Sequence, residues 1–230
     1  MAVTEFGPMV VKPGLDVMDE STPEGKIVHS AWKGVTSEKT GPFRVYWGME
    51  VESPENLWSF FDFESVEEHK KFAKEHGIHH VKDFDKVFER SVFQKHLGDE
   101  TFPPTAFKSP VTEIMLAYFP SGISSEAKAA ATERIAQFKE NGLNKCADVQ
   151  AANFGWAVEH DFAVPGEEGK TATALSLLIG WPSIDAHMRF RETDAFKESI
   201  GLIRGMEGLL RVTMCHVKCK TIENEKRKAE

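Results

Sequence analysis

The chain has 230 residues, of which 41% are hydrophobic, and it carries a formal net charge of −8 with a pI near 5.6. This length allows one large domain or two small ones, and an acidic chain without a basic cluster is not expected to bind nucleic acid or an anionic membrane. The three cysteines follow no metal-ligand spacing and no apolar run has bilayer-spanning length, so we expect a reduced, cytoplasmic protein.

The N-terminal part of the chain predicts strands and helices in alternation. Apolar residues alternate along strands and recur every three to four residues along helices. The expected elements are, in order, a strand at residues 9–11, a helix from Ser21, strands at 43–51 and 57–63, a helix from Ser65, a helical stretch at 81–88 and a strand at 91–95.

The same order returns in the C-terminal part. The expected strands are 113–119, 149–162, 171–181 and 209–217, and the expected helices are 125–140 and 183–203, the latter interrupted near Thr193. Residues 101–110 contain three prolines and no apolar periodicity, which favours a linker. Residues 221–230 are charged and have no apolar pattern, which favours a disordered tail. The chain is therefore predicted to divide into a first repeat at 1–100, a linker at 101–110, a second repeat at 111–220 and a disordered tail at 221–230.

A repeated motif supports the duplication. Residues 63–72, Phe-Glu-Ser-Val-Glu-Glu-His-Lys-Lys-Phe, match residues 181–190, Trp-Pro-Ser-Ile-Asp-Ala-His-Met-Arg-Phe, at a constant spacing of 118 residues. Ser65 and Ser183 stand where an N-cap accepts a hydrogen bond from a free N–H group of the first helical turn. We therefore expect His69 and His187 to occupy equivalent positions in two copies of one fold.

The order of elements predicts the fold class. Each half is predicted as strand, helix, strand, strand, helix, strand, which is the ferredoxin-like order of one antiparallel sheet with helices on one face. The second sheet face still needs cover, and two copies can supply it for each other. The prediction is an α+β protein with two tandem ferredoxin-like repeats, packed sheet to sheet as a pseudo-dimeric α/β barrel.

Three segments give the chain a family resemblance. They are residues 60–69, Phe-Phe-Asp-Phe-Glu-Ser-Val-Glu-Glu-His, residues 77–81, Gly-Ile-His-His-Val, and residues 177–187, Leu-Leu-Ile-Gly-Trp-Pro-Ser-Ile-Asp-Ala-His. The chain resembles the dimeric α/β-barrel superfamily, and it is most similar to the antibiotic-biosynthesis-monooxygenase group and the stress-responsive barrel domains. Fused two-copy members resemble those of fungal secondary metabolism. The superfamily includes cofactor-free oxygenases, cyclases, lyases, isomerases, haem-degrading enzymes and proteins of no known activity.

Candidate site residues follow from strand alternation and from this resemblance. Polar residues that share the sheet face away from the helices are expected to line a pocket, because an unpaired polar group in a dry core costs about 1–3 kcal/mol. The predicted catalytic residues are Asp62, Tyr46 and His80, the last because it matches a histidine in the second helix of related domains. Asp62 is either a general acid or base or a structural carboxylate at a strand end. The predicted substrate-binding residues are Trp58, Glu50, Asn153, Tyr118 and His216.

The favoured function is a cofactor-independent tailoring enzyme that acts on a hydrophobic small molecule of polyketide or terpenoid type. Acid and base groups would assist cyclisation, isomerisation or elimination in the barrel cavity. The alternatives are a cofactor-free monooxygenase that oxidises an electron-rich aromatic with O₂, and a non-catalytic ligand-binding or stress-associated barrel. A haem-handling protein would need an axial histidine, for which His216 is the candidate. We expect no cofactor and no metal, because no phosphate loop or ligand-spaced set of side chains is present. The fused chain is also a candidate for a homodimer.

Overall fold

The computed structural model describes residues 1–227 and divides into two compact units. The first unit, which we call the N-terminal repeat, joins residues 1–99 with the segment from Val217 onward. The second, the C-terminal repeat, contains residues 100–216. None of the described helices is both long enough and apolar enough to cross a membrane.

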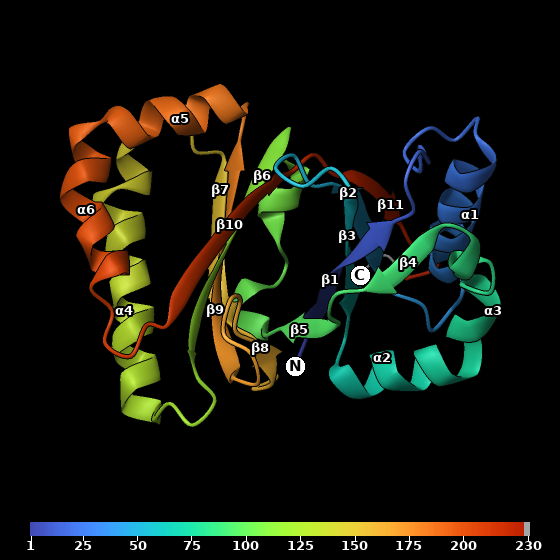
Figure 1. Ribbon diagram of the computed structural model, residues 1–230, viewed down its shortest axis with the longest axis horizontal. Helices are drawn as coiled ribbons and strands as arrows, with labels where there is room; N and C mark the ends of the chain where they lie inside the picture. Colours follow the sequence, from blue (N-terminus) through green and yellow to red (C-terminus); the bar gives the residue numbers. More distant parts are fainter. Residues whose placement is uncertain (228–230) are drawn as a thin grey trace. The chain divides into compact units, whose positions relative to one another are not determined.

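The N-terminal repeat is one antiparallel sheet with helices on one face (Figure 1). The strand order is β11-β2-β3-β1-β4, with β5 also paired to β1. Without β11 this is the ferredoxin-like order. The strands are β1 (Val3–Val11), β2 (Arg44–Met49), β3 (Asn56–Phe63), β4 (Phe88–Ser91), β5 (Lys95–Leu97) and β11 (Lys220–Glu223), and the helices are α1 (Pro23–Ser37), α2 (Val66–Phe72), the π-helical turn η1 (Ala73–Gly77), α3 (Ile78–His80) and the 3₁₀ turn η2 (Phe84–Lys86).

The C-terminal repeat has the same plan, with strand order β10-β6-β9-β7 and β8 paired to β9. Its helices α4, α5 and α6 again cover one sheet face (Figure 1). The duplicated order confirms the predicted α+β class and the two ferredoxin-like repeats. The elements are η3 (Asp99–Thr101), η4 (Thr105–Lys108), β6 (Val111–Pro120), α4 (Ser125–Asn141), η5 (Leu143–Lys145), β7 (Ala151–Trp156), β8 (Phe162–Ala163), β9 (Thr171–Trp181), α5 (Ile184–Glu192), α6 (Asp194–Arg204) and β10 (Arg211–Val217).

Strand alternation places the core of the N-terminal repeat between sheet and helices. Val45 and Trp47 of β2 join Trp32 of α1 in one buried apolar cluster. Tyr46 lies between Val45 and Trp47 in sequence and therefore points to the opposite sheet face, because successive side chains of a strand alternate. Burial of apolar area at about 25 cal/mol per Å² stabilises this helix-facing cluster.

The two helix starts predicted from the repeated motif are confirmed. Ser65 Oγ accepts a hydrogen bond from the N–H of Glu68 at 3.1 Å, and Ser183 Oγ accepts one from Ala186 at 3.1 Å. The predicted interruption near Thr193 is also confirmed, because α5 ends at Glu192 and Thr193 is the N-cap of α6. Both repeats therefore begin the helix after the third strand in the same way.

Two predicted segments differ from the structure. The helical stretch expected at 81–88 contains only the short turn η2, and Phe88 already begins β4. Pairing of Val10 with Arg90 and of Val11 with Phe88 extends the sheet there, so tertiary contacts override the local helical pattern. The expected linker at 101–110 is packed into the C-terminal repeat, where Ala106 and Phe107 are buried.

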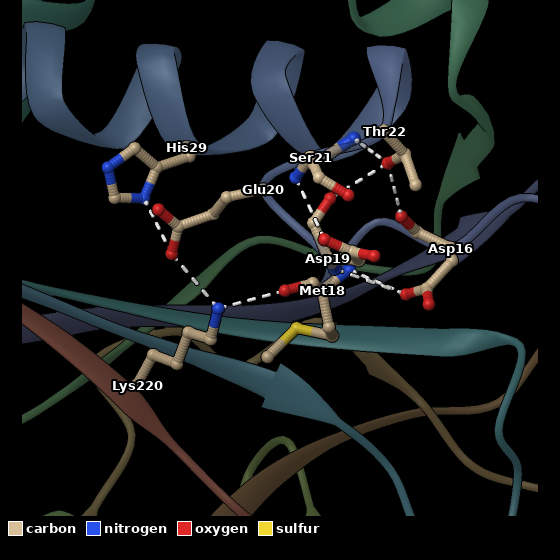
Figure 2. Close-up of polar contacts among 9 residues, drawn as sticks. Asp16, Met18, Asp19, Glu20, Ser21, Thr22, His29 and Lys220 are labelled. Atoms are coloured by element: carbon tan, nitrogen blue, oxygen red, sulfur yellow. Dashed lines mark hydrogen bonds and ion pairs between the residues drawn. The ribbon is translucent and has the colours of Figure 1, made fainter.

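The predicted disordered tail is wrong for the residues that the structure describes. Strand β11 pairs antiparallel with β2, and the Asn224 side chain donates to the carbonyl oxygens of Glu38 and Pro42. Figure 2 shows Lys220 of β11 reaching the loop before α1, where its ammonium donates to Met18 O at 2.8 Å and Glu20 at 3.0 Å. A charged segment can be ordered when the sheet edge satisfies its backbone. Residues 228–230 of the predicted tail lie outside the described part.

Candidate functional site

A chain of three polar side chains crosses the N-terminal repeat. Glu5 of β1 and His96 of β5 are direct partners across the sheet, and His69 of α2 contacts both. His69 Nε2 lies 3.1 Å from Glu5 Oε2, and His69 Nδ1 lies 2.8 Å from His96 Nε2. Glu5 and His96 are each 5% exposed. We call this set the N-terminal relay.

The C-terminal repeat contains the equivalent set, Glu113, His187 and His216, which we call the C-terminal relay. His187 Nδ1 lies 2.8 Å from His216 Nε2, and His187 Nε2 lies 3.6 Å from Glu113 Oε2. Trp181 donates its indole N–H to Glu113 at 3.0 Å and stacks on His187 at 5.2 Å between ring centroids. The match of His69 with His187 confirms the equivalence predicted from their spacing.

The relays suit proton transfer because their central histidines have both ring nitrogens engaged. In the N-terminal relay, where His69 Nε2 lies 3.1 Å from Glu5, an ionised carboxylate can only accept, so a neutral His69 ring donates its Nε2–H to Glu5. Its Nδ1 then accepts the Nε2–H of the second histidine. The glutamate thereby fixes the tautomers of both rings, as carboxylates do for histidines in many sites. In the N-terminal relay the carboxylate of Glu5 is consequently the group suited to take a proton from a bound molecule.

The N-terminal relay borders an apolar cavity of about 430 Å³ between the sheet and its helices. Glu5 and His69 are part of its wall, together with Ala73 and Gly77 of the π-helical turn. Such turns are frequent at functional sites because they displace the helix backbone locally. The volume lies in the range of about 300–1,000 Å³ typical of ligand pockets. The wall also has the charged residues Asp85, Glu89 and Arg90. Six aromatic side chains belong to it as well: Trp32, Phe61, Phe63, Phe72, Phe84 and Phe88.

The predicted catalytic residues Asp62 and Tyr46 lie together on the opposite sheet face. Asp62 is fully buried, accepts a hydrogen bond from Thr4 Oγ1 at 2.7 Å, and lies 3.3 Å from Arg44 Nε. Arg44 also donates to Tyr46 Oη at 3.3 Å, and burial raises the pKa of Tyr46 to about 12. These contacts are typical of a structural carboxylate, and the pocket expected beside Asp62 and Tyr46 stays a prediction.

The structure separates the other N-terminal candidates from the cavity beside Glu5. Trp58 donates its indole N–H to Glu50 at 2.8 Å, and its ring stacks on Phe60 at 6.0 Å. The imidazole of His80 packs against α1 at Gly34, with Nε2 3.5 Å from Glu38. None of the three predicted residues Trp58, Glu50 and His80 belongs to the wall of the 430 Å³ cavity.

The C-terminal candidates have distinct surroundings. The Asn153 side chain holds the segment before β6 by two hydrogen bonds. It accepts one from the backbone N–H of Ala106 at 3.1 Å and donates one to Pro103 O at 3.3 Å. Tyr118 Oη lies 3.5 Å from Thr213 Oγ1, and burial raises the pKa of Tyr118. Only His216 belongs to a relay, and an axial haem bond through its Nε2 would break the contact with His187.

Sequence reasoning missed Glu5, His96 and Glu113. A signal for the two glutamates is present, because Val3-Thr-Glu5 recurs as Val111-Thr-Glu113 at the starts of equivalent strands. This three-residue match is short beside the ten-residue repeat around His69 and His187, and Glu113 was expected only as the first residue of a strand. The role of His96 depends on pairing of β5 with β1, which has no local signature.

The C-terminal relay is also the described group that comes closest to a metal site. One donor atom each of Glu113, His187 and His216 lies within 4.8 Å of the others. However, His187 faces Glu113 through Nε2 and His216 through Nδ1. Because His187 Nδ1 lies at a hydrogen-bond distance of 2.8 Å from His216 Nε2, the contacts as they stand form a hydrogen-bonded chain. The expected absence of metal stays a prediction.

Comparison with known proteins identifies the fold. No family model matches the chain, and no curated protein matches its sequence. Among solved structures, a proposed monooxygenase from Fusobacterium nucleatum has a TM-score of 0.61 at 11% identity over 97% of this chain and 94% of its own. An anthrone oxidase-like protein has a TM-score of 0.60 at 14% identity over 99% and 95%. A variant of the chlorite dismutase from Candidatus Nitrospira defluvii has a TM-score of 0.52 at 10% identity over 94% and 90%. The chain therefore shares its fold, two tandem repeats of ferredoxin-like strand order, with these proteins.

Proposed function

We propose that the chain is a cofactor-independent oxidase or monooxygenase that acts on a hydrophobic, electron-rich aromatic in the cavity of the N-terminal repeat. One observation carries the proposal: Glu5 and His69 of the N-terminal relay stand in the wall of a mainly apolar cavity to which six aromatic side chains also belong. A base in apolar surroundings is suited to deprotonate a phenol or an activated CH₂ group of a bound ring system.

The reaction needs only the substrate, O₂ and proton transfer. Glu5 removes a proton from an activated CH₂ group, and the anion is stabilised by its conjugated rings. The anion donates one electron to O₂, and the radical pair combines into a carbon-bound peroxide. The relay returns the proton to the distal peroxide oxygen, and loss of the remaining C–H proton breaks the O–O bond. The sum is R₂CH₂ + O₂ → R₂C=O + H₂O.

The names of the structural neighbours support oxidation over the cyclisation that the sequence favoured. Two neighbours that match both repeats are described as a proposed monooxygenase and as anthrone oxidase-like. At 11% and 14% identity they share the fold, and the chemistry is inferred from the relay and the cavity. Cyclisation, isomerisation or elimination would use the same base without O₂. A homodimer of the fused chain is also part of the proposal, and sedimentation of the purified protein tests it.

The test uses anthrone, a three-ring ketone with an activated CH₂ group, as the probe. Oxygen uptake and the formation of anthraquinone are measured for the wild type and for Glu5→Gln. A general base contributes about 10²–10⁴-fold, so Glu5→Gln is expected to slow uptake at least about 100-fold. Glu133→Gln, on the exposed face of α4, is the matched control and should retain the wild-type rate.

A second comparison locates the reaction. Glu113→Gln makes the same change in the C-terminal relay, and we expect a smaller loss than in Glu5→Gln. Equal loss in both variants would contradict assignment to the N-terminal cavity. Turnover of a substrate at the same rate under argon would show that the reaction does not consume O₂, and would favour cyclisation or isomerisation over oxidation. Binding of the probe without turnover in the wild type would favour the non-catalytic alternative.

A further inference from the structure

The C-terminal repeat contains its own cavity, of about 190 Å³, beneath α5 and α6. Glu113 and His187 of the C-terminal relay belong to its wall and are 7% and 4% exposed. Apolar side chains of β6, β9 and the helices form most of the rest, including Leu177 and Phe138. The cavity is smaller than the range of about 300–1,000 Å³ that suits drug-sized ligands, so a single ring is the size to expect.

Two arginines belong to the wall of this cavity. Arg191 of α5 is half-buried and Arg204 of α6 is exposed, so the positive charges lie on its solvent side. Within the described chain neither guanidinium has a carboxylate at ion-pair distance, and Arg191 contacts Met188 Sδ at 3.9 Å. By contrast, Arg189 on the same helix is paired with Asp148 at 3.0 Å.

The duplication shows that the position of Arg191 differs between the two cavities. The spacing of 118 residues that relates His69 to His187 relates Ala73 to Arg191. Both Ala73 and Arg191 belong to the walls of their cavities. At this matched position the N-terminal cavity therefore has a methyl group where the C-terminal cavity has a guanidinium. The N-terminal wall has an arginine of its own, Arg90, but there it stands with the acidic residues Asp85 and Glu89.

We propose that the cavity of the C-terminal repeat is a binding site for a small aromatic carboxylate. The ring packs against Leu177 and Phe138, and the carboxylate pairs with Arg191 at the solvent side. A guanidinium offers two parallel N–H groups that match the two carboxylate oxygens. The reverse orientation would place the ligand carboxylate against Glu113, where like charges repel. This site is independent of the oxidation proposed for the N-terminal repeat.

Benzoate is the probe, and methionine methyl NMR locates it. Met115 and Met214 line the C-terminal cavity, whereas Met9 lines the N-terminal one. Benzoate is expected to shift the methyl signals of Met115 and Met214 and to leave Met9 unchanged. Benzyl alcohol, which has the same ring without the charge, should bind at least about tenfold more weakly, since a charged hydrogen bond contributes about 1.5–3 kcal/mol.

Variants on one helix provide the decisive comparison. Arg191→Gln is expected to weaken benzoate binding about tenfold or more and to leave the affinity for benzyl alcohol within twofold. Arg189→Gln removes the same charge from α5 outside the cavity wall and should leave benzoate affinity within about twofold, because long-range charge effects are screened. Shifts centred on Met9, equal affinity for the acid and the alcohol, or equal effects of the two variants would each overturn the proposal.

Discussion

Arg44 of β2 holds two carboxylates in very different surroundings, which allows a sharp prediction about Asp62. Its Nε lies 3.3 Å from Asp62 Oδ2 and 3.5 Å from Glu223 Oε2. The Asp62 side chain is 0% exposed and that of Glu223 is 44% exposed. Neutralising each carboxylate in turn therefore compares a buried and an exposed ion pair on one cation.

The expected losses in the free energy of unfolding differ severalfold between the two variants. Removing one partner of a buried ion pair costs about 3–5 kcal/mol. After Asp62→Asn, Arg44 keeps Glu223 and is itself 21% exposed, and the new amide can still accept from Thr4, so we expect a loss of about 2–3 kcal/mol. Glu223→Gln should cost less than about 1 kcal/mol, as exposed pairs do. A loss of this size is expected of a structural carboxylate, the second of the two alternatives that the sequence left open for Asp62.

Urea unfolding of the two variants and the wild type measures both costs, and oxygen uptake on the same samples measures function. A stability loss in Asp62→Asn with turnover preserved would identify a structural carboxylate. Equal stability of Asp62→Asn and Glu223→Gln would refute the reasoning, because burial would then not strengthen the dependence on Asp62. Slow turnover of Asp62→Asn at unchanged stability would support the predicted catalytic role of Asp62.

Three further predictions follow from the described contacts. Unfolded tyrosine ionises near pH 10, but burial raises the pKa of Tyr46 to about 12 and raises that of Tyr118, so ultraviolet titration of the folded protein should show little tyrosinate near pH 10. The folded state then holds more protons than the unfolded chain between pH 10 and about 12, and the free energy of unfolding should fall across that window; a constant value would contradict it. Arg227 lies 4.0 Å from the Phe43 ring centroid and 2.9 Å from Glu68, so Arg227→Ala should cost about 1–2 kcal/mol in urea unfolding, and an unchanged free energy of unfolding would show that these two contacts contribute nothing. The purified protein should be colourless and keep its activity in a chelator, whereas stoichiometric metal lost together with activity on His187→Ala would replace the relay by a metal site.

The fold was predictable because its signals are local and occur twice. The motifs that begin at Ser65 and Ser183 each cap a helix after a strand, and alternation along β2 assigned Tyr46 and Trp47 to opposite faces correctly. Because the order of elements recurs in both copies, one local error does not change the predicted fold. An example is the helix expected where Phe88 begins β4.

The relays were less predictable because they depend on contacts distant in sequence. Glu5, His69 and His96 come from β1, α2 and β5, three elements far apart in the sequence. The start of β1 escaped detection because Gly7 and Pro8 interrupt its apolar pattern, although both fit within the strand. The ordered segment around Asn224 was missed for a similar reason, since its partners at Glu38 and Pro42 are far away in the chain.

The central claim, that Glu5 removes a proton from a substrate in the N-terminal cavity, can be measured without O₂. Under argon in D₂O, exchange of the activated CH₂ protons of the probe reports deprotonation alone, and proton NMR follows it. We predict that the wild type accelerates this exchange over buffer and that Glu5→Gln slows the protein-dependent rate at least about 100-fold. Exchange at the same rate in Glu5→Gln as in the wild type, or no faster than in buffer for both, would contradict the claim.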